Sequence, residues 1–267
     1  MTPTVVALFV ATGVVGGFIA GFLGVGGGVL FVPCLYYGFV WIGVEPNVAF
    51  LAAVGTSLAV IVVTSLSASL GHALHGALTG GQVLSMAILA VPFSVVGAGI
   101  AQVVGGAFLK RFFGLFLLAM AYRFFRPDTR KEIDPDRIVP IPDLMIVGGI
   151  SGLMSSLLGI GGGIVTVSLL HLVLRVPIHR AVANSSGLIV FSSLAGTIAW
   201  IYSGLGEEGL PAYSFGYVNL VAWATLSFTA VLFAQWGAWV ASRSRPEGLK
   251  KPFAVILALV GLKMLFF

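Results

Sequence analysis

Two apolar segments of this chain are interrupted by nearly the same glycine-rich run. Residues 23–29 read LGVGGGV and residues 158–164 read LGIGGGI. Each glycine costs about 1 kcal/mol relative to alanine inside a helix, so three in succession favour a break in the backbone. A broken backbone inside a membrane must be buried in protein or line a cavity, because lipid offers its polar groups no partner. The two runs therefore predict two buried interruptions at corresponding places of a duplicated unit.

The composition sets the environment of these breaks. The chain has 267 residues, of which 58% are hydrophobic and only 9% are charged. Such a chain has too few polar residues to cover a water-soluble domain, so we predict an all-α polytopic membrane protein. The net charge of +5 is not a nucleic-acid footprint, because the basic residues lie between apolar segments and not along one helix face. The chain start lacks the pattern of a cleaved signal peptide.

The apolar segments fall into two similar sets. The first set begins with the broken region 5–44. As one helix this region would be about 60 Å long, about twice the hydrocarbon thickness of a membrane, so it must fold back or cross twice. The second set begins with the broken region 142–176. The remaining predicted spans are 48–70, 81–104 and 108–125 in the first set and 181–202, 217–242 and 253–267 in the second.

A charged, proline-containing stretch separates the two sets and reads as a linker. We therefore divide the chain into a first transmembrane repeat of about four hydrophobic segments at 1–125, a charged linker at 126–141, and a second repeat at 142–267. The chain has one cysteine, Cys34, so it cannot form an internal disulfide; this cysteine lies in an apolar run.

Basic residues predict the orientation, since lysine and arginine mark cytoplasmic loops. If each broken region crosses the membrane once, the basic clusters are divided almost evenly between the two membrane faces. An even number of crossings, or a re-entrant hairpin, gathers the clusters at 123–137, 175–180 and 243–251 on one face. Opposite them lie Lys110, Arg111, Lys263, Glu45, Glu207 and Glu208. The second count predicts two inverted halves, a cytoplasmic linker, and both termini away from the cytoplasm.

The glycine runs have three readings. A dinucleotide-binding fingerprint lacks the required alternation of strands and helices. Small residues for close helix packing are ordinary in membrane bundles. The third reading is a binding site near the membrane midplane, where exposed amides at a helix start face a bound anion. It is favoured because the break recurs in both halves, and its predicted ligands are Gly26, Gly27, Gly28, Gly161, Gly162 and Gly163.

A polar cluster follows each break by about twenty to thirty residues. Residues 55–57 read Gly-Thr-Ser, and residues 184–186 read Asn-Ser-Ser. A carboxamide in an apolar interior needs partners, and neutral donors from both halves suit the oxygens of a small anion. We add Thr56, Ser57, Asn184, Ser185 and Ser186 to the predicted substrate site. The hydroxyls of Ser65, Ser67, Ser192 and Ser193 are expected only to bond the carbonyl one turn back.

Two histidines, His72 and His75, lie three residues apart at an expected cytoplasmic helix end. Ordinary interfacial placement is one interpretation, and a proton-responsive gate is the other, because histidine titrates near physiological pH. The sequence contains no catalytic triad pattern, no paired carboxylates in an apolar span and no clustered metal ligands. We expect neither an enzyme nor a bound metal or cofactor.

Three first-half motifs, at 21–28 with Pro33, at 53–57, and at 71–76, resemble the TauE/SafE family of membrane permeases, the sulfite exporters. The second half resembles that family's repeated segment through Gly152, the run 159–163 and residues 180–186. At 184–186 the chain has Asn-Ser-Ser where the commoner family pattern resembles Gly-Thr-Ser. The resemblance spans nearly the whole chain. It implies transport of sulfite, a sulfonate or a related small anion, driven by an ion gradient.

These observations predict a secondary transporter in the cytoplasmic (inner) membrane that binds an anion between the breaks and works by alternating access. An anion channel and a non-transporting membrane component of a larger complex are the rival classes. The expected partners are the anion and the lipid bilayer, with no nucleic acid. The direction of transport, the coupling ion and a homo-oligomeric state stay open.

Overall fold

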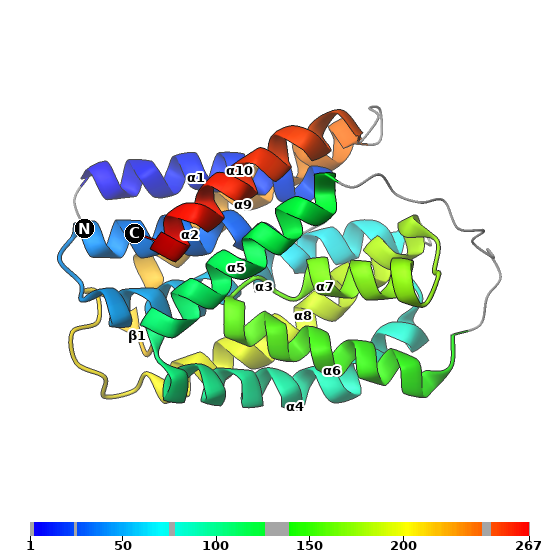
Figure 1. Ribbon diagram of the computed structural model, residues 1–267, viewed down its shortest axis with the longest axis horizontal. Coiled ribbons are helices and arrows are strands. Elements are labelled where there is room, and N and C mark those ends of the chain that lie inside the picture. The colour runs from blue at the N-terminus through cyan, green and yellow to red at the C-terminus, as the bar shows by residue number, and fades with distance from the viewer. Residues whose placement is uncertain (1–2, 24–25, 75–77, 126–138, 242–246, 267) are drawn as a thin grey trace.

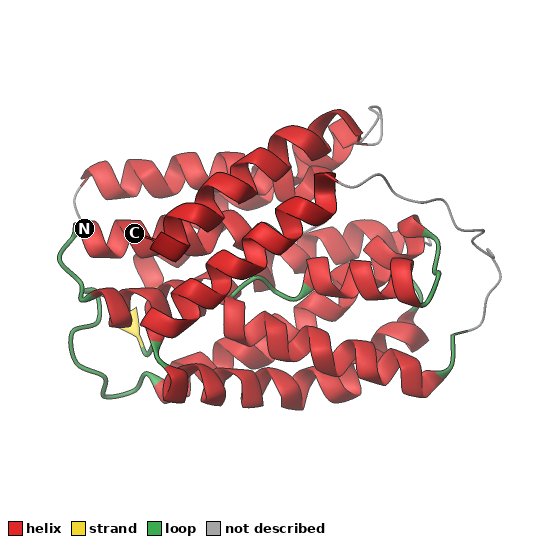
Figure 2. Cartoon of the chain, viewed as in Figure 1, coloured by secondary structure: helices red, strands yellow, loops and turns green. Residues whose placement is uncertain are grey.

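The computed structural model describes residues 3–23, 26–74, 78–125, 139–241 and 247–266, and these ranges are almost entirely helical (Figures 1 and 2). The first half contains α1 Pro3–Leu23, α2 Gly28–Trp41, α3 Pro46–Leu74, α4 Gly80–Val104 and α5 Gly106–Phe125. The second half contains α6 Ile141–Leu158, α7 Gly163–Ser168, the π-helical turn η1 Leu169–Val173, α8 Ile178–Ser203, α9 Leu220–Ala241 and α10 Glu247–Phe266. Most of the predicted linker, 126–138, lies outside the described residues.

Six helices in the described ranges are long and apolar enough to cross a membrane: α1, α3, α4, α6, α8 and α9. Shorter apolar helices accompany them at residues 28–41, 163–173 and 254–266. The prediction of an all-α polytopic membrane protein is confirmed. The predicted span 108–125 corresponds to α5, which has Lys110 and Arg111 near its start and Arg123 in its last turn.

Both glycine-broken regions fold back on themselves. Phe9 near the start of α1 packs edge-on against Phe39 near the end of α2, with ring centroids 6.0 Å apart. Further along α1, a Cβ atom added at Gly16 would lie 2.6 Å from the ring of Phe31, near the start of α2. These contacts make α1 and α2 an antiparallel pair. Figure 1 shows the same reversal between α6 and α7.

The long helices pair mostly across the two halves. α1 packs against α9, α4 against α6, and α5 against α10, while α3 and α8 pack together. Glycines make these approaches close: a Cβ atom at Gly114 of α5 would lie 2.8 Å from the carbonyl oxygen of Gly261 in α10. If the two halves are related by inversion, α6 corresponds to α1 and α4 corresponds to α9, so the α1–α9 pair should have its counterpart in the α6–α4 pair. The inverted repeat stays a prediction, and these pairings are consistent with it.

One part of the second half departs from the predicted spans. The sequence places the start of a span at residue 217, whereas α9 begins at Leu220. Residues before it form a small antiparallel hairpin of β1 Ser214–Phe215 and β2 Val218–Asn219. The polar side chain of Asn219 holds this hairpin: its Nδ2 donates to the carbonyl of Ala212 and to the Ser214 hydroxyl. Local turn bonding therefore replaces the first residues of the predicted helix.

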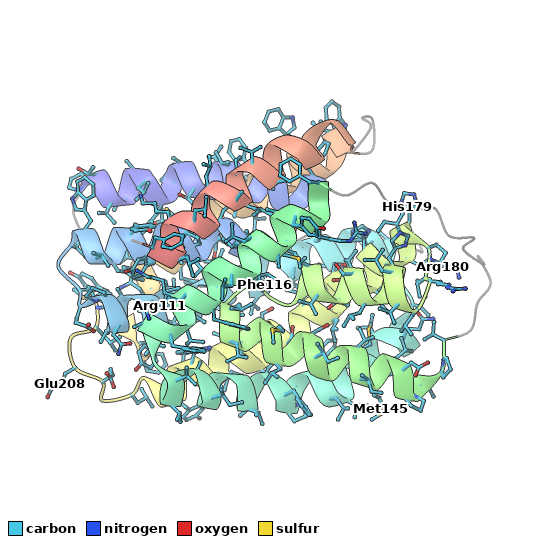
Figure 3. The ribbon with its side chains drawn as sticks, viewed as in Figure 1. Arg111, Phe116, Met145, His179, Arg180 and Glu208 are labelled. Atoms are coloured by element: carbon cyan, nitrogen blue, oxygen red, sulfur yellow. The ribbon has the colours of Figure 1, made fainter. Side chains whose placement is uncertain are left out.

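Charged side chains mark the two ends of the bundle. His179 and Arg180 lie at one end, whereas Arg111 and Glu208 lie at the other (Figure 3). Lys110 and Lys263 belong to the second end, since they lie 5.4 and 4.3 Å from the ring centroids of Tyr36 and Tyr37 on α2. Two broken regions that fold back predict this distribution of charged residues between the two ends.

Candidate functional site

The first break is a tight turn built from glycines in left-handed conformations. Gly26 has φ +83° and Gly27 has φ +67°, which side chains other than glycine rarely adopt. The Gly28 N–H donates to the Gly26 carbonyl at 2.8 Å, and Gly27 then caps the start of α2. The predicted interruption is therefore present, and its left-handed conformations favour glycine at positions 26 and 27.

The second break repeats this geometry. Gly159, Gly161 and Gly162 have φ +66°, +74° and +75°, and α7 begins directly after them. The Gly159 N–H closes α6 by donating to the Ser155 carbonyl at 2.9 Å. Within the described part of the chain, the N–H groups of Gly161 and Gly162 have no hydrogen-bond partner. The second break thus presents buried donors that are free to bind a ligand.

The two breaks lie in direct contact. A Cβ atom added at Gly28 would lie 2.6 Å from the Gly159 carbonyl oxygen and 2.7 Å from the Ile160 Cα. Gly26 likewise faces the Ile160 carbonyl oxygen, which is 3.6 Å from its Cβ position. Sequence segments that are far apart therefore meet as two backbone turns with no side chain between them.

This meeting point lies half-way along the two central helices. Ile61, near the middle of α3, contacts Gly28 of the first break and Gly161 of the second. Ile189, near the middle of α8, contacts Gly26 and Gly161. α3 is the most enclosed of the six long helices, with 83% of its apolar window buried. The breaks are therefore central in the bundle.

Serine hydroxyls fix the second break in place. Ser57 of α3 donates to the Gly159 carbonyl at 2.7 Å, and Ser185 of α8 donates to the Gly163 carbonyl at 3.2 Å. The sequence predicts that Ser192 bonds only its own helix, but it donates to the Gly161 carbonyl at 3.3 Å as well as to Ile189. Ser65 and Ser193 make only the expected bonds within their helices. Ser57 and Ser185 are thus next to the breaks as predicted, yet their protons are directed at carbonyls.

Thr56 points to a different part of the molecule. Its hydroxyl accepts from the Asn219 N–H at 2.9 Å and donates to the Tyr217 carbonyl at 3.4 Å. It is fully buried and anchors the β1–β2 hairpin to α3. Adjacent residues of one helix, Thr56 and Ser57, therefore hold the hairpin and the second break respectively.

Asn184 and Ser186 also make their hydrogen bonds away from the glycines. The Asn184 Oδ1 accepts from the Thr79 N–H at 2.8 Å, and its Nδ2 donates to the Gln82 Oε1 at 2.7 Å. Asn184 thereby ties the first turns of α8 to the start of α4. Ser186 donates to the Ala183 carbonyl at 2.7 Å within its own helix. The start of α4 thus provides the hydrogen-bond partners that the buried Asn184 carboxamide needs.

The two histidines give no further evidence for a gate. His72 lies in the last turn of α3. His75 lies outside the described residues. Among the described residues, no group of three or more histidine, cysteine, aspartate or glutamate side chains could hold a metal ion.

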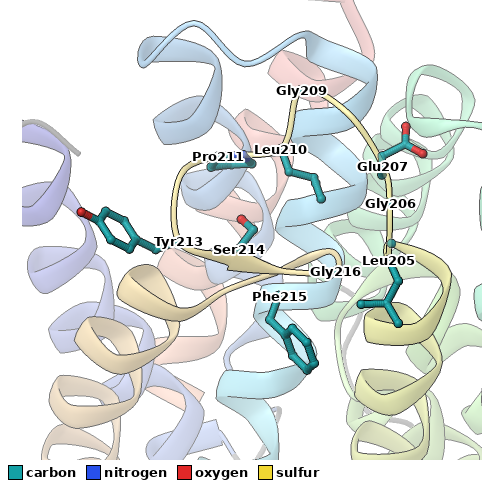
Figure 4. A pocket seen from close by; sticks show the side chains of 11 residues that line it. Leu205, Gly206, Glu207, Gly209, Leu210, Pro211, Tyr213, Ser214, Phe215 and Gly216 are labelled. Carbon is teal, nitrogen blue, oxygen red and sulfur yellow. The ribbon is translucent and has the colours of Figure 1, made fainter.

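A pocket of about 400 Å³ lies at the end of the bundle that carries Glu208, away from the breaks. The loop between α8 and α9 curves round it, with Leu210 and Pro211 on one side and Gly216 on the other (Figure 4). Directly after Gly216 in the chain, the buried Tyr217 ring packs edge-on against Trp200, with centroids 5.3 Å apart. Burial and the hydrogen-bonded Glu207 carboxylate raise the pKa of Tyr217 to about 12. The hairpin therefore closes this end of the α3–α8 pair.

Comparison with known proteins decides the family. The sequence model of the family described as "Sulfite exporter TauE/SafE" matches residues 9–264. The chain belongs to the TauE/SafE family. A probable membrane transporter protein of Methanocaldococcus jannaschii is 30% identical over 97% of this TauE/SafE chain and 94% of its own length. A probable membrane transporter protein of Haemophilus influenzae is 27% identical over 98% of both chains. YunE of Bacillus subtilis, a probable membrane transporter protein, is 24% identical over 97% of both.

Proposed function

We propose that this TauE/SafE chain is a secondary transporter that carries a small sulfur-containing or organic anion, such as sulfite or a sulfonate, across the cytoplasmic membrane. The observation that carries the proposal is the direct contact of the two glycine breaks, half-way along α3 and α8. Broken backbone at the centre of a membrane bundle is typical of transporter binding sites.

The donors at the breaks suit an anion. The free N–H groups of Gly161 and Gly162 lie directly before the start of α7, where the backbone dipole favours negative charge. The first break contributes Gly26 and Gly27, whereas the Gly28 N–H already donates to the Gly26 carbonyl. We keep Ser57 and Ser185 in the site as supports of the break, and we leave out Thr56, Asn184 and Ser186, whose polar atoms bond elsewhere.

The arrangement also suits alternating access. The breaks belong to different halves and touch without a side chain between them, so rocking of one half against the other would open the contact. The relatives are named as probable membrane transporters, and the family description refers to sulfite export. Neutral donors would release the anion more readily than a buried arginine, and an ion gradient would drive net movement.

Flux measurements on the purified protein in proteoliposomes test this function. We expect saturable uptake of one or more of sulfite, thiosulfate, sulfoacetate and acetate, and accumulation against a gradient when a proton or sodium gradient is imposed. Fast, non-saturating flux that runs only downhill would identify a channel instead. No flux of any of the four anions under either gradient would contradict the proposed function.

A further inference from the structure

The two glycine breaks differ in the side chains that surround them. When residues 24–28 are aligned with 159–163, Gly16, Ala20 and Phe31 of the first half correspond to Ser151, Ser155 and Thr166 of the second. Three apolar positions around the first break are therefore three hydroxyl positions around the second. A duplicated unit has become chemically asymmetric at its centre.

The first break is packed by an aromatic ring. A Cβ atom added at Gly27 would lie 2.7 Å from the ring of Phe31 and 3.2 Å from the Ala20 Cβ. Phe31 is fully buried and also fills the space beside Gly16. Among the described residues, the side chains against Gly27, those of Phe31 and Ala20, are apolar, so they offer a ligand no hydrogen bond.

The second break faces hydroxyls instead. A Cβ atom added at Gly162 would lie 2.5 Å from the Ser151 carbonyl oxygen and 3.4 Å from the Ser155 Cβ, so both serines of α6 lie against the break. Ser151 is 1% exposed and Ser155 is fully buried. Thr166 completes the set, but its hydroxyl donates to the Gly162 carbonyl at 3.0 Å.

The hydroxyls of Ser151 and Ser155 have no hydrogen-bond partner in the described structure. A serine inside a helix usually bonds the carbonyl one turn back, as Ser85 and Ser203 do here. Burying a hydroxyl without a hydrogen-bond partner costs free energy, and here two such hydroxyls lie one helical turn apart. Both lie beside a break that has free amides. A ligand that accepts hydrogen bonds would remove this disadvantage.

We propose that Ser151 and Ser155 bind an oxyanion directly, so that the ligand is held against the second half. Residues one helical turn apart have Cβ atoms about 5–6 Å apart, a spacing that one oxyanion with two or more oxygens can bridge. Sulfite, sulfonates and carboxylates meet this condition, because each has two or more oxygens that can accept one bond from each serine. This inference rests on the proposed function and assigns two further ligand residues to it.

Thermal unfolding of the purified full chain tests the assignment, with sulfite, thiosulfate, sulfoacetate and acetate as probes and sodium chloride as the ionic-strength control. We expect Ser151→Ala and Ser155→Ala each to weaken the apparent affinity for the stabilising anion about tenfold or more, because each removes a bond to a charged group. Without anion, both variants should unfold at or above the wild-type temperature, since each loses an unpaired buried hydroxyl. Ser227→Ala, which removes another buried unpaired hydroxyl from α9, is the matched control and should keep wild-type affinity.

The outcomes separate this assignment from the proposed function. Wild-type stabilisation by an oxyanion, with equal affinity in the double variant Ser151→Ala/Ser155→Ala, would overturn the serine assignment and leave the transport proposal standing. Loss of anion-free stability in the single variants would also overturn it, because the serines would then have structural partners. Absence of stabilisation of the wild-type protein by all four probes would overturn both.

Discussion

The Ser57 hydroxyl on α3 donates to the Gly159 carbonyl at 2.7 Å, so a side chain of the first half fixes the backbone break of the second. Ser57 is fully buried, and Gly159 lies in the left-handed region that ends α6. This bond explains why a polar side chain is present half-way along the most enclosed helix. It also makes the geometry of one break depend on the position of the other half.

Replacing Ser57 by alanine removes this bond and leaves a buried carbonyl unsatisfied. We expect a loss of about 1–3 kcal/mol in the free energy of unfolding, together with a lower transport rate. Denaturation and flux assays on the same preparation measure both. Ser85→Ala, which removes a bond within α4 from Ser85 to Gly81, is the control and should leave transport unchanged. Wild-type stability and flux in Ser57→Ala would contradict the role given to this bond.

The contact between the breaks predicts that Gly28 tolerates no side chain. In Gly28→Ala the new Cβ would lie 2.6 Å from the Gly159 carbonyl oxygen, and backbone cannot move aside as a flexible side chain would. We expect a destabilisation of about 1–3 kcal/mol from overpacking, measured by thermal unfolding. Gly99→Ala on α4 places its Cβ in open space and should unfold at or above the wild-type temperature. Equal stability of the two variants would show that the breaks are not in contact.

Thr56 is expected to hold the hairpin closed. Thr56→Val keeps the shape of the side chain but removes the acceptor of the Asn219 N–H and the donor to the Tyr217 carbonyl. Losing one or two such bonds corresponds to about 1–3 kcal/mol, so hydrogen exchange in residues 213–219 should become about tenfold to a hundredfold faster. In Thr225→Val, which loses a bond within α9, exchange in the hairpin should stay at the wild-type rate. If Thr56→Val leaves the hairpin amides as protected as before, the anchor lies elsewhere.

The raised pKa of Tyr217, at the same end of the bundle, predicts that the stability of the fold depends on pH. Burial and the Glu207 carboxylate raise the pKa of Tyr217 to about 12, so the folded state favours the protonated phenol. The stability from this preference is fully present below the ordinary tyrosine pKa of about 10 and is lost as the pH rises through about 12. Unfolding curves should therefore show wild type losing stability relative to Tyr217→Phe between about pH 10 and pH 12. Parallel curves for the two proteins across that range would refute the assignment.

Sequence reasoning located the breaks because three successive glycines strongly disfavour a continuous helix. It predicted an interruption at each glycine run, and α2 and α7 begin at the last glycine of each run; for both regions it favoured an even number of crossings or a re-entrant hairpin. The destination of Asn184 could not be predicted, because a buried carboxamide requires partners without specifying which helix provides them. The hairpin was missed since its apolar residues read as the start of a helix. The contrast between Phe31 and Thr166 is visible in the aligned repeats, but it does not follow from the glycine pattern.

The central claim is that the touching glycine breaks form the transport site, and flux through Gly162→Leu in proteoliposomes tests it most directly. Gly162 has φ +75°, and a Cβ atom there would lie 2.5 Å from the Ser151 carbonyl oxygen, so leucine would deform the second break. Gly99→Leu adds the same side chain to an open position on α4 and serves as the control for membrane insertion. We predict that Gly162→Leu inserts and purifies like the control but transports none of the anions that the wild type carries, while Gly99→Leu transports normally. Wild-type flux through Gly162→Leu would contradict the account.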